Sequence, residues 1–372
     1  MTVKILYLDH ATALGGAEYS LLLLLKHLDR KAFTPLLACR EGLLAQEARA
    51  LGIQVEIVPL ERLRGVYDPF LLLGRFWRGV SSLRVLVERE GVDLIHSNVM
   101  RASLYAAAAA KLAGVLFLWH VRDIHTERWY SWLLCRLADR AIATSQAVTR
   151  PLPCSSKVEV VPNGLELEIY DPHLEGVTFR QELSLASDVP LVGIVGRIRP
   201  WKGQTLFLEA ASRVASQDSR VRFLVVGETI FPGQPCLEGL KDLAQRLGLG
   251  ERVILTGHRQ DIPRVLASLD ILVHCSQAEP FGRVLVEGMA MAKPIVAFAD
   301  GAVPEIVKDG ETGLLVPPGD VGALAQAILS LLGNGEQRQE MGQRGRERVE
   351  ANFDVRPLTR RVEEIYRFLL RS

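Results

Sequence analysis

The stretch DILVHCSQAEPFGRVLVEGMAMAKP, from Asp270 to Pro294, decides the fold that we expect for this chain. Its apolar run from Ile271 to Cys275 is short and bounded by turn residues, which predicts a buried parallel strand. Pro280 suits the first turn of a helix, where its missing N–H costs little, and a helical run follows from Gly282 to Ala292. A second strand is expected from Pro294 to Phe298. The stretch therefore predicts one strand–loop–helix–strand unit of an α/β protein.

Two carboxylates belong to this unit, Glu279 in the loop and Glu287 two turns into the helix. Glu287 shares a helix face with Val284, Gly288 and Met291, which are spaced three and four residues apart. A carboxylate on such an apolar face needs a partner, because burying it alone costs free energy. The N–H groups at the start of the helix could bind a phosphate or a sugar oxygen. The residues alone leave two interpretations open: a turn with two solvated glutamates, or an anion site between two acids.

Length and composition indicate two globular domains. The chain has 372 residues, of which 48% are hydrophobic, enough material for two cores. The net charge of +1 gives no overall field that would attract nucleic acid. The longest apolar stretch, residues 102–118, is interrupted by Lys111 and Gly114 and falls short of a membrane span. We therefore expect a soluble protein without a nucleic-acid partner.

The cysteines form no recognisable metal or redox motif. They are scattered and odd in number, at Cys39, Cys135, Cys154, Cys236 and Cys275. This pattern predicts reduced thiols in a cytosolic protein. The first residues, MTVKILYLDH, predict a strand rather than a signal peptide, because the apolar run is short and contains an acid.

The N-terminal half begins with a strand–turn–helix unit. The strand is expected from Val3 to Leu8, followed by Gly15, Gly16 and a helix that carries Leu21 to Leu25. The glycines form either a simple tight turn or a close approach to a ligand; the G-x-G-x-x-G dinucleotide spacing is missing here. Further strands are expected at residues 34–38, 55–58, 92–96, 115–121, 141–145 and 157–161.

Polar residues follow two of these strands. Open α/β sheets bind ligands at the carboxyl ends of their strands, so His120, Asn98, Arg101 and Asp123 are candidates for a site. A single histidine such as His120 is more often structural, and both roles stay open from the residues alone.

Two longer segments separate the predicted strands. Residues 60–90 mix arginine with aromatic and aliphatic residues, so they form either a helix packed on its own sheet or a basic amphipathic segment on an anionic membrane. Residues 165–190 are polar and weakly periodic, and we expect them to be the interdomain linker.

The second half repeats the pattern of the first. A strand is expected from Leu191 to Val195, and a glycine-containing loop then places Arg197 five residues before Lys202. Two cations at the start of a helix could clamp a diphosphate, with charge-assisted bonds that strengthen as negative charge develops. The alternative is a solvated loop that happens to carry two basic residues.

The central stretch resembles a known family. Glu279 and Glu287 are separated by seven residues and enclose Phe281 and Gly282, and this arrangement resembles the E-x7-E signature of the retaining glycosyltransferases of family GT4. The resemblance covers nearly the whole chain and is strongest over residues 191–318. It implies a GT-B fold, in which two Rossmann-like, doubly wound parallel-sheet domains face each other across a cleft. The implied domains are residues 1–170, on the acceptor side, residues 171–353, which bind the donor, and residues 354–372, a helix that crosses back.

The resemblance also implies an activity. A sugar would pass from a nucleotide-diphosphate donor to an acceptor hydroxyl with retention of configuration, without a metal or cofactor, as in a hexosyltransferase. The implied catalytic residues are His120, Glu279, Arg197 and Lys202. The implied donor-binding residues are Gly15, Gly16, Arg197, Lys202, Phe281, Gly282 and Glu287. The implied acceptor side holds Asn98, Arg101 and Asp123.

The residues around the sugar pocket bear on the identity of the substrates. Gly288, Lys293 and the run from Asp300 to Ala302 differ from the usual family residues around the sugar pocket. A UDP-sugar is the expected donor, with GDP- and ADP-sugars as alternatives, for a glycan, lipid-linked or small-molecule acceptor in polysaccharide or glycolipid synthesis. We expect a cytoplasmic protein with possible peripheral contact to the inner membrane surface. A non-catalytic GT-B protein that binds a nucleotide or glycan is the alternative function.

Overall fold

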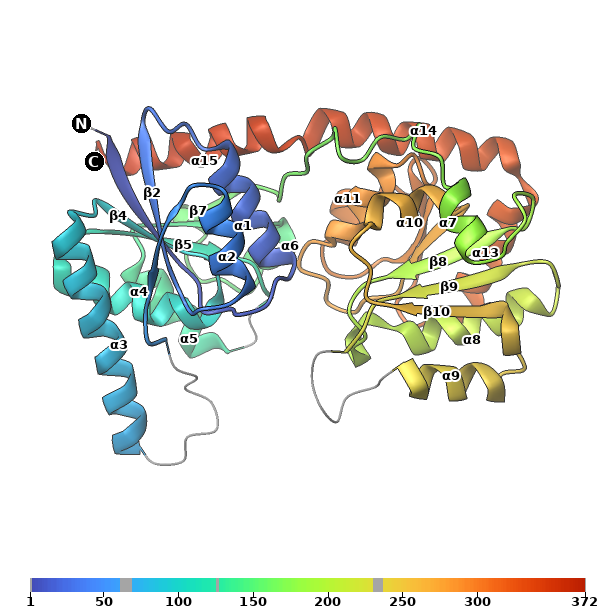
Figure 1. Ribbon diagram of the computed structural model, residues 1–372, viewed down its shortest axis with the longest axis horizontal. Coiled ribbons are helices and arrows are strands. Elements are labelled where there is room, and N and C mark those ends of the chain that lie inside the picture. Colours follow the sequence, from blue (N-terminus) through green and yellow to red (C-terminus); the bar gives the residue numbers. More distant parts are fainter. Residues whose placement is uncertain (1, 61–68, 125–126, 230–236, 372) are drawn as a thin grey trace. The chain divides into compact units, whose positions relative to one another are not determined.

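The computed structural model describes residues 2–60, 69–124, 127–229 and 237–371. The chain divides into two compact units (Figure 1). Unit 1 comprises Met1–Gly164 and Val355–Ser372, and unit 2 comprises Leu165–Asp354. Each unit is a Rossmann-like parallel sheet with helices on both faces, as the resemblance implied. The helix that begins at Val355 therefore belongs to unit 1, although unit 2 precedes it in the chain.

Unit 1 is built on a parallel sheet in the order β3-β2-β1-β4-β5-β6-β7, counting its described residues. The strands are β1 Val3–Leu8, β2 Phe33–Cys39, β3 Gln54–Ile57, β4 Leu94–Ser97, β5 Leu116–Val121, β6 Arg140–Ala143 and β7 Val158–Val160. The helices are α1 Gly16–His27, α2 Leu43–Ala50, α3 Pro69–Glu90, α4 Met100–Ala113, α5 Arg128–Leu137, α6 Gln146–Thr149 and α15 Val355–Leu369. The strands predicted from the sequence are confirmed to within about two residues.

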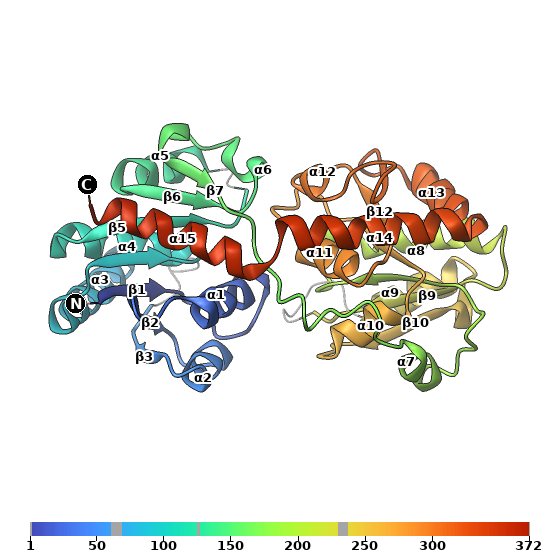
Figure 2. The same ribbon diagram turned by 90° about the horizontal axis from the view of Figure 1, so that it is seen from above.

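Both faces of this sheet are buried, which explains the unbroken apolar character of its strands. In β1, Ile5 and Tyr7 belong to one core cluster, whereas Leu6 and Leu8 belong to the cluster on the opposite face. Figure 2 shows α15 lying over the sheet of unit 1. Its apolar residues, spaced three and four apart, join the cluster of Ile5 and Tyr7 and include the fully buried Tyr366.

Unit 2 is built on a second parallel sheet, in the order β10-β9-β8-β11-β12-β13 among its described residues. The strands are β8 Leu191–Val195, β9 Arg222–Val226, β10 Val253–Gly257, β11 Ile271–His274, β12 Ile295–Phe298 and β13 Gly313–Val316. The helices are α7 Val177–Glu182, α8 Gln204–Ala215, α9 Leu237–Arg246, α10 Ile262–Ser268, α11 Arg283–Ala290, α12 Val303–Ile306, α13 Val321–Gly333 and α14 Gly335–Asn352. The strand–loop–helix–strand unit predicted from residues 270–298 is thus β11, α11 and β12.

Each sheet has one point at which the strand order reverses. This point lies between β1 and β4 in unit 1 and between β8 and β11 in unit 2. The loops after these strands leave in opposite directions, so a crevice forms at their carboxyl ends, where open α/β sheets bind ligands. The candidate site residues are distributed around these two points.

The linker prediction for residues 165–190 is wrong, because this segment is part of unit 2. Leu165, Tyr170 and Phe179 are buried in its core, and α7 forms within the segment. The buried Arg180 donates to the backbone oxygen of Ser268 at 2.9 Å. The apolar residues are spaced without helix or strand periodicity, and for that reason the sequence pattern did not reveal their burial.

The prediction of reduced thiols is also wrong, because Cys135 and Cys154 form a disulfide. The two residues are 19 positions apart, a spacing that matches no motif. The fold brings them together because Cys135 lies in α5, just before β6, and Cys154 lies just before β7, the strand next to β6. Cys39 and Cys275 are free and buried, and Cys236 lies outside the described residues.

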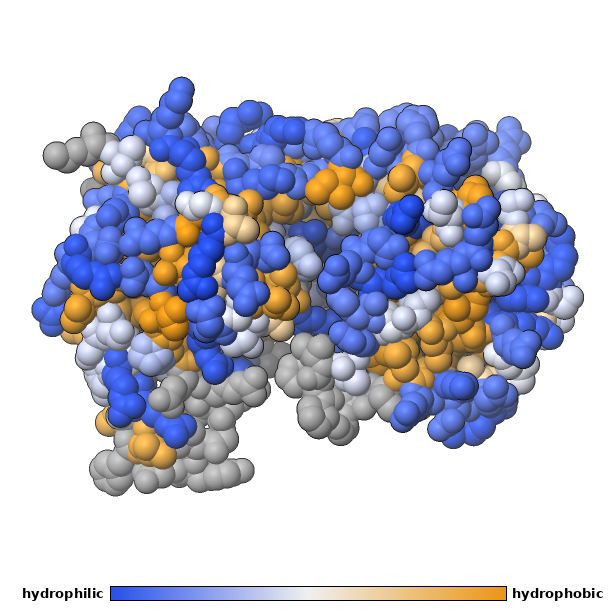
Figure 3. Space-filling model, in the orientation of Figure 1, coloured by the Kyte–Doolittle hydropathy of each residue, from blue (hydrophilic) through white to orange (hydrophobic). Residues whose placement is uncertain are grey.

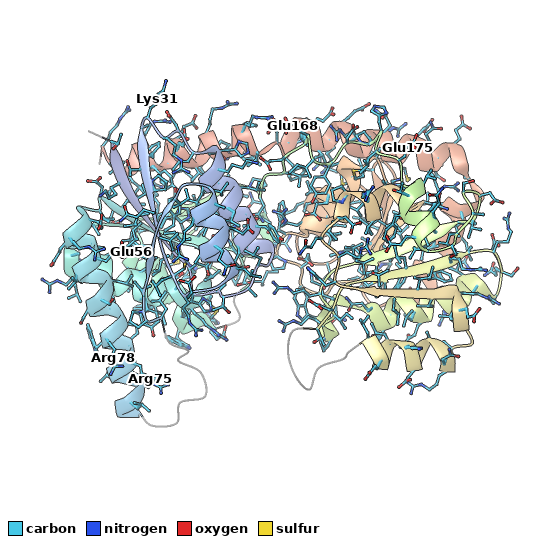
Figure 4. All side chains as sticks on the ribbon, in the orientation of Figure 1. Lys31, Glu56, Arg75, Arg78, Glu168 and Glu175 are labelled. Atoms are coloured by element: carbon cyan, nitrogen blue, oxygen red, sulfur yellow. A yellow bond between two sulfur atoms is a disulfide. The ribbon has the colours of Figure 1, made fainter. Side chains whose placement is uncertain are left out.

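Part of the amphipathic segment 60–90 packs on its own sheet, which was one of the two interpretations that the sequence left open. Residues 61–68 lie outside the described ranges. The second half of α3 packs on the sheet through residues such as Val80 and Leu83, whereas its first half exposes Trp77. Figure 4 labels Arg75 and Arg78 on this first half, and Figure 3 shows hydrophobic and hydrophilic surface side by side there. Within the described ranges, every helix lacks the length and apolar character needed to cross a bilayer.

If residues 165–190 are part of the unit 2 core, Phe179→Ala should lower the free energy of unfolding by about 3–5 kcal/mol, the usual cost of removing a buried phenyl ring. Val177→Ala is the matched control, because Val177 lies on the same helix but is 45% exposed. Urea unfolding of both variants measures the difference. Equal, small effects would mean that α7 is only a tether.

Candidate active site

The loop after β8 places two cations at the reversal point of unit 2. Arg197 lies two residues after the strand, and its backbone oxygen accepts a hydrogen bond from Gln204 Nε2 at 3.0 Å. Burial and then the charge of Arg197 lower the pKa of Arg199. The loop ends at Gly203, whose φ of 74° suits glycine, and an added Cβ there would lie 2.3 Å from the backbone oxygen of Cys275.

The loop after β11 brings Glu279 to the same point. Its side chain is buried, and Lys202 Nζ donates to its Oε2 at 2.6 Å. His274 Nε2 lies 3.2 Å from the same oxygen but lacks the alignment of a hydrogen bond. The Lys202–Glu279 ion pair therefore joins the loops that follow β8 and β11. The sequence placed these two residues in separate motifs, and the structure brings them into contact.

The charges of this cluster depend on one another. Burial acts to raise the pKa of Glu279, but the charge of Lys202 and the contact with His274 outweigh it and hold the pKa well below its usual range. Burial lowers the pKa of His274 in spite of its acidic neighbour. At neutral pH the cluster therefore contains an ionised Glu279 and a neutral His274.

The backbone around Glu279 is held in an uncommon conformation. Ala278 has φ of 47°, in the left-handed region that non-glycine residues seldom adopt. Its N–H donates to Asp300 Oδ2 at 2.8 Å, and the Glu279 oxygen accepts from Ala302 N at 2.8 Å. Gly301 packs so closely that an added Cβ would lie 2.5 Å from Glu279 N. Strained backbone that is fixed from several sides is typical of functional sites.

Helix α11 begins at this loop and carries the other predicted donor-binding residues. Gly282 precedes it with φ of 84° and provides no side-chain cap. The Phe281 ring is buried against Phe353. Glu287 pairs with Arg283 at 3.0 Å, which supplies the partner that a carboxylate on this face requires.

Unit 1 holds a second polar cluster at its own reversal point. His120 lies near the end of β5, is 5% exposed, and approaches His96 at 3.0 Å and Arg122 at 3.4 Å. Arg122 also donates to Asn98 Oδ1 at 2.7 Å, and Asn98 Nδ2 donates to Asp9 Oδ2 at 2.7 Å. Asn98 is thus fully buried between an acid and a base rather than exposed to an acceptor.

The remaining predicted residues of unit 1 lie around this cluster. Gly15 and Gly16 begin α1, where Glu18 in the first turn is buried. Burial and then the charge of Glu18 raise the pKa of Asp9 to about 7. Arg101, in the first turn of α4, and Asp123, which follows β5, are exposed.

Several residues of the two clusters were missed by the sequence analysis, namely Asp9, His96, Arg122 and His274. Each lies within two residues of the carboxyl end of a parallel strand, and all four are in or next to apolar runs. That position was the available signal, because a polar side chain at the end of a buried strand points to the ligand-binding edge of the sheet.

Comparison with known proteins identifies the class. The family model described as Glycosyl transferases group 1 matches residues 177–348, and the model described as Glycosyltransferase Family 4 matches residues 14–169. The matches divide between the two units. The chain belongs to this glycosyltransferase family, as the resemblance in its sequence indicated.

Individual relatives agree with this assignment. A D-inositol 3-phosphate glycosyltransferase of Mycobacterium sp. (strain KMS) is 36% identical over 205 residues, 53% of this chain and 46% of that protein. One from Nocardia farcinica is 32% identical over 292 residues, 76% of this chain and 62% of that protein. The chain thus matches about half to two thirds of the length of these curated relatives.

A solved structure matches over nearly the full length. The Anabaena protein Alr3699/HepE, crystallised with UDP-glucose, superimposes with a TM-score of 0.86 and 28% identity over 98% of this chain and 99% of that one. The fold of this chain is therefore the GT-B fold of glycosyltransferases.

The Lys202–Glu279 pair makes a testable contribution to stability. Lys202→Met leaves Glu279 buried without its cation, and we expect a loss of about 3–5 kcal/mol in the free energy of unfolding at pH 7.5. In the wild type, the lowered pKa of Glu279 means that its contribution is present above about pH 4 and is lost as the pH falls. Without Lys202 burial dominates and the pKa rises, so the cost should shrink as the pH falls from 7.5 to 5.

Urea unfolding of Lys202→Met, Glu279→Gln and the double variant measures this effect. The double variant should be more stable than Lys202→Met, because it carries no buried unpaired charge. Additive effects that do not change with pH would show that the two side chains are independent.

Proposed function

We propose that the protein is a retaining, metal-independent glycosyltransferase that moves a sugar from a nucleotide-diphosphate donor to an acceptor hydroxyl. The observation that carries this proposal is the buried Lys202–Glu279 pair at the reversal point of unit 2. A carboxylate and a cation fixed side by side provide an acceptor for sugar hydroxyls and a charge for a diphosphate. The strained loop that holds Glu279 supports a role beyond stability.

The electrostatics of the site favour particular roles. Lys202 and Arg197 would bind the diphosphate and stabilise the negative charge that develops on it as the glycosidic bond breaks. Backbone N–H groups at Gly282 and the start of α11 would add to this stabilisation. Glu279, with its lowered pKa, is a poor proton acceptor, so it would position the sugar ring by accepting hydrogen bonds rather than act as a general base.

The other predicted residues complete this proposal. Glu287 would bind the nucleotide ribose from α11, Gly15 and Gly16 would approach the donor phosphates, and Phe281 would contribute its backbone. His120 would contact the sugar from unit 1. Arg101 and Asp123, both exposed, remain candidates for the acceptor side.

A UDP-sugar is the donor that we favour, because the Anabaena neighbour was crystallised with UDP-glucose. GDP- and ADP-sugars are the alternatives. The acceptor would be a hydroxyl of a glycan, a lipid-linked sugar or a small molecule. We also propose a cytoplasmic location with peripheral membrane contact through the first half of α3, where Trp77 is exposed beside Arg75 and Arg78.

The alternative is a non-catalytic protein that binds a nucleotide or glycan on the same fold. It would bind a nucleoside diphosphate without turnover, and substitutions at Glu279 would change affinity alone. Initial rates measured beside binding therefore separate the two functions.

Substitution of the two glutamates of the central stretch should have different effects, one on turnover and the other on nucleotide binding. Glu279→Gln should lower turnover by about tenfold or more, because it removes a charged acceptor from the sugar, while the nucleoside diphosphate still binds. Glu287→Ala should weaken binding of the nucleoside diphosphate itself. Calorimetric titration with UDP, GDP and ADP, beside initial rates with the matching sugar donors, measures both effects.

Glu340→Ala is the matched control for Glu287→Ala. It removes a helical Glu–Arg pair of the same i,i+4 spacing, but at an exposed position on α14, and should change neither rate nor binding. If Glu279→Gln loses nucleotide affinity and Glu287→Ala keeps it, the two roles are reversed. If neither variant differs from the wild type, the central stretch is structural.

Transfer should continue in the presence of EDTA, because Arg197 and Lys202 provide positive charge for the leaving diphosphate and the sequence contains no Asp-x-Asp motif. Initial rates with and without chelator, followed by addition of magnesium or manganese, test this expectation. Activity that is lost with EDTA and restored by a metal would assign the charge stabilisation to the metal instead.

A further inference from the structure

A chain of buried polar side chains connects α15 to His120 inside unit 1. Tyr7 and Tyr366 hydroxyls lie 3.0 Å apart, and the Tyr366 hydroxyl lies 2.6 Å from His96 Nδ1. His96 Nε2 lies 3.0 Å from His120 Nδ1, with the two imidazole rings stacked at 5.2 Å. All four side chains are at most 5% exposed. They come from three strands and one helix. The row of hydrogen-bonded side chains runs from the core on one face of the sheet to the carboxyl edge of the sheet.

Arg122 determines which atom donates and which accepts in each of these hydrogen bonds. Its Nη2 lies 3.4 Å from His120 Nδ1, and a guanidinium group can only donate. His120 Nδ1 is therefore an acceptor, and the second group that faces it, His96 Nε2, must carry a hydrogen. His96 Nδ1 is then the acceptor of the Tyr366 hydroxyl, and Tyr366 in turn accepts from Tyr7. The opposite direction would place an N–H of His120 against the N–H groups of Arg122.

This direction leaves the last hydrogen on His120 Nε2. That atom is buried and has no hydrogen-bond partner among the described residues. A buried donor without a partner costs free energy, and in native proteins such groups often have a functional reason. Burial and the charge of Arg122 lower the pKa of both histidines, so the rings stay neutral and the direction is maintained at physiological pH.

We propose that His96 and Tyr366 are positioning residues that hold His120 as an Nε2–H hydrogen-bond donor toward an oxygen of the donor sugar. The sugar contact rests on the proposed function, whereas the direction of the hydrogen bonds does not. His120 then serves as a donor of fixed orientation rather than as a base. The helix α15 thus acts on His120 through Tyr366 and His96.

Histidine ring nitrogens provide the first test. In protein labelled with ¹⁵N-histidine, both His120 and His96 should show a protonated Nε2 and an unprotonated Nδ1, with the His120 signals assigned by their loss in His120→Gln. This measurement needs no substrate. A protonated Nδ1 on either histidine would overturn the proposal, even in a protein that proves to be an active glycosyltransferase.

Kinetics with the sugar donor provide the second test. His96→Phe should lower kcat/KM for the donor about fivefold or more, whereas the Kd of the nucleoside diphosphate should stay within about twofold. His96→Gln places an amide N–H near the original Nε2 and should restore most of kcat/KM. A merely structural role would not separate sugar-dependent rate from nucleotide binding, or Gln from Phe.

Two tyrosine variants keep the test decisive if His96→Phe does not fold. Tyr366→Phe removes the hydroxyl that donates to His96 and should lower donor kcat/KM about threefold. Tyr7→Phe removes an equally buried hydroxyl one step further away and should leave it unchanged. Equal effects of the two variants, or equal effects of His96→Phe and His96→Gln, would refute the positioning role. If no nucleotide sugar is transferred although the nitrogen signals are as expected, the proposed function fails and the assigned hydrogen-bond direction stands.

Discussion

The ion pair between Lys202 and Glu279 is the interaction on which the candidate site of unit 2 depends. A carboxylate that is buried to this extent is stable as an anion only because a cation contacts it directly. The pair also ties the loop after β8 to the loop after β11, and a backbone hydrogen bond from Gln277 to Trp201 reinforces the same connection at 2.8 Å. The charge state of Glu279 and the relative position of the two loops therefore depend on the same contact. A ligand that attracts Lys202 must offer Glu279 hydrogen bonds in return.

The two units stabilise a buried acid in different ways. Each places polar side chains where its strand order reverses, and in each an acid contacts a residue from the neighbouring strand end. In unit 2 that contact is a salt bridge. In unit 1 it is the neutral amide of Asn98 between Asp9 and Arg122, and without a direct cation the pKa of Asp9 rises to about 7. Both acids are buried, but Lys202 keeps Glu279 ionised, whereas burial and the charge of Glu18 raise the pKa of Asp9 so that it can hold its proton.

The sequence predicted most of the strands, because parallel strands that are buried on both faces have continuous apolar sequences, as in β1, β5 and β11. It also predicted that Glu279, Lys202 and Arg197 belong to one kind of site, although their contact depends on the order of strands that lie far apart in the chain. Residues 165–190 were misassigned because their burial comes from single aromatic residues without periodicity. The Cys135–Cys154 bond and the His96–His120 pair were missed for a related reason. Both depend on which strands are neighbours, and no local pattern records that arrangement.

The division of unit 1 between residues up to Gly164 and residues from Val355 has a consequence for biosynthesis. A ribosome releases the whole of unit 2 before it releases α15, so unit 2 can fold while one face of the first sheet is covered by α1 and α2 but not yet by α15. During that interval Ile5 and Tyr7 lack the helix that covers them, and His96 lacks the hydroxyl of Tyr366. The apolar surface left open in this way is the kind that chaperones bind in nascent chains. The polar cluster around His120 becomes complete only when α15 docks, so that maturation of unit 1 waits for the synthesis of unit 2.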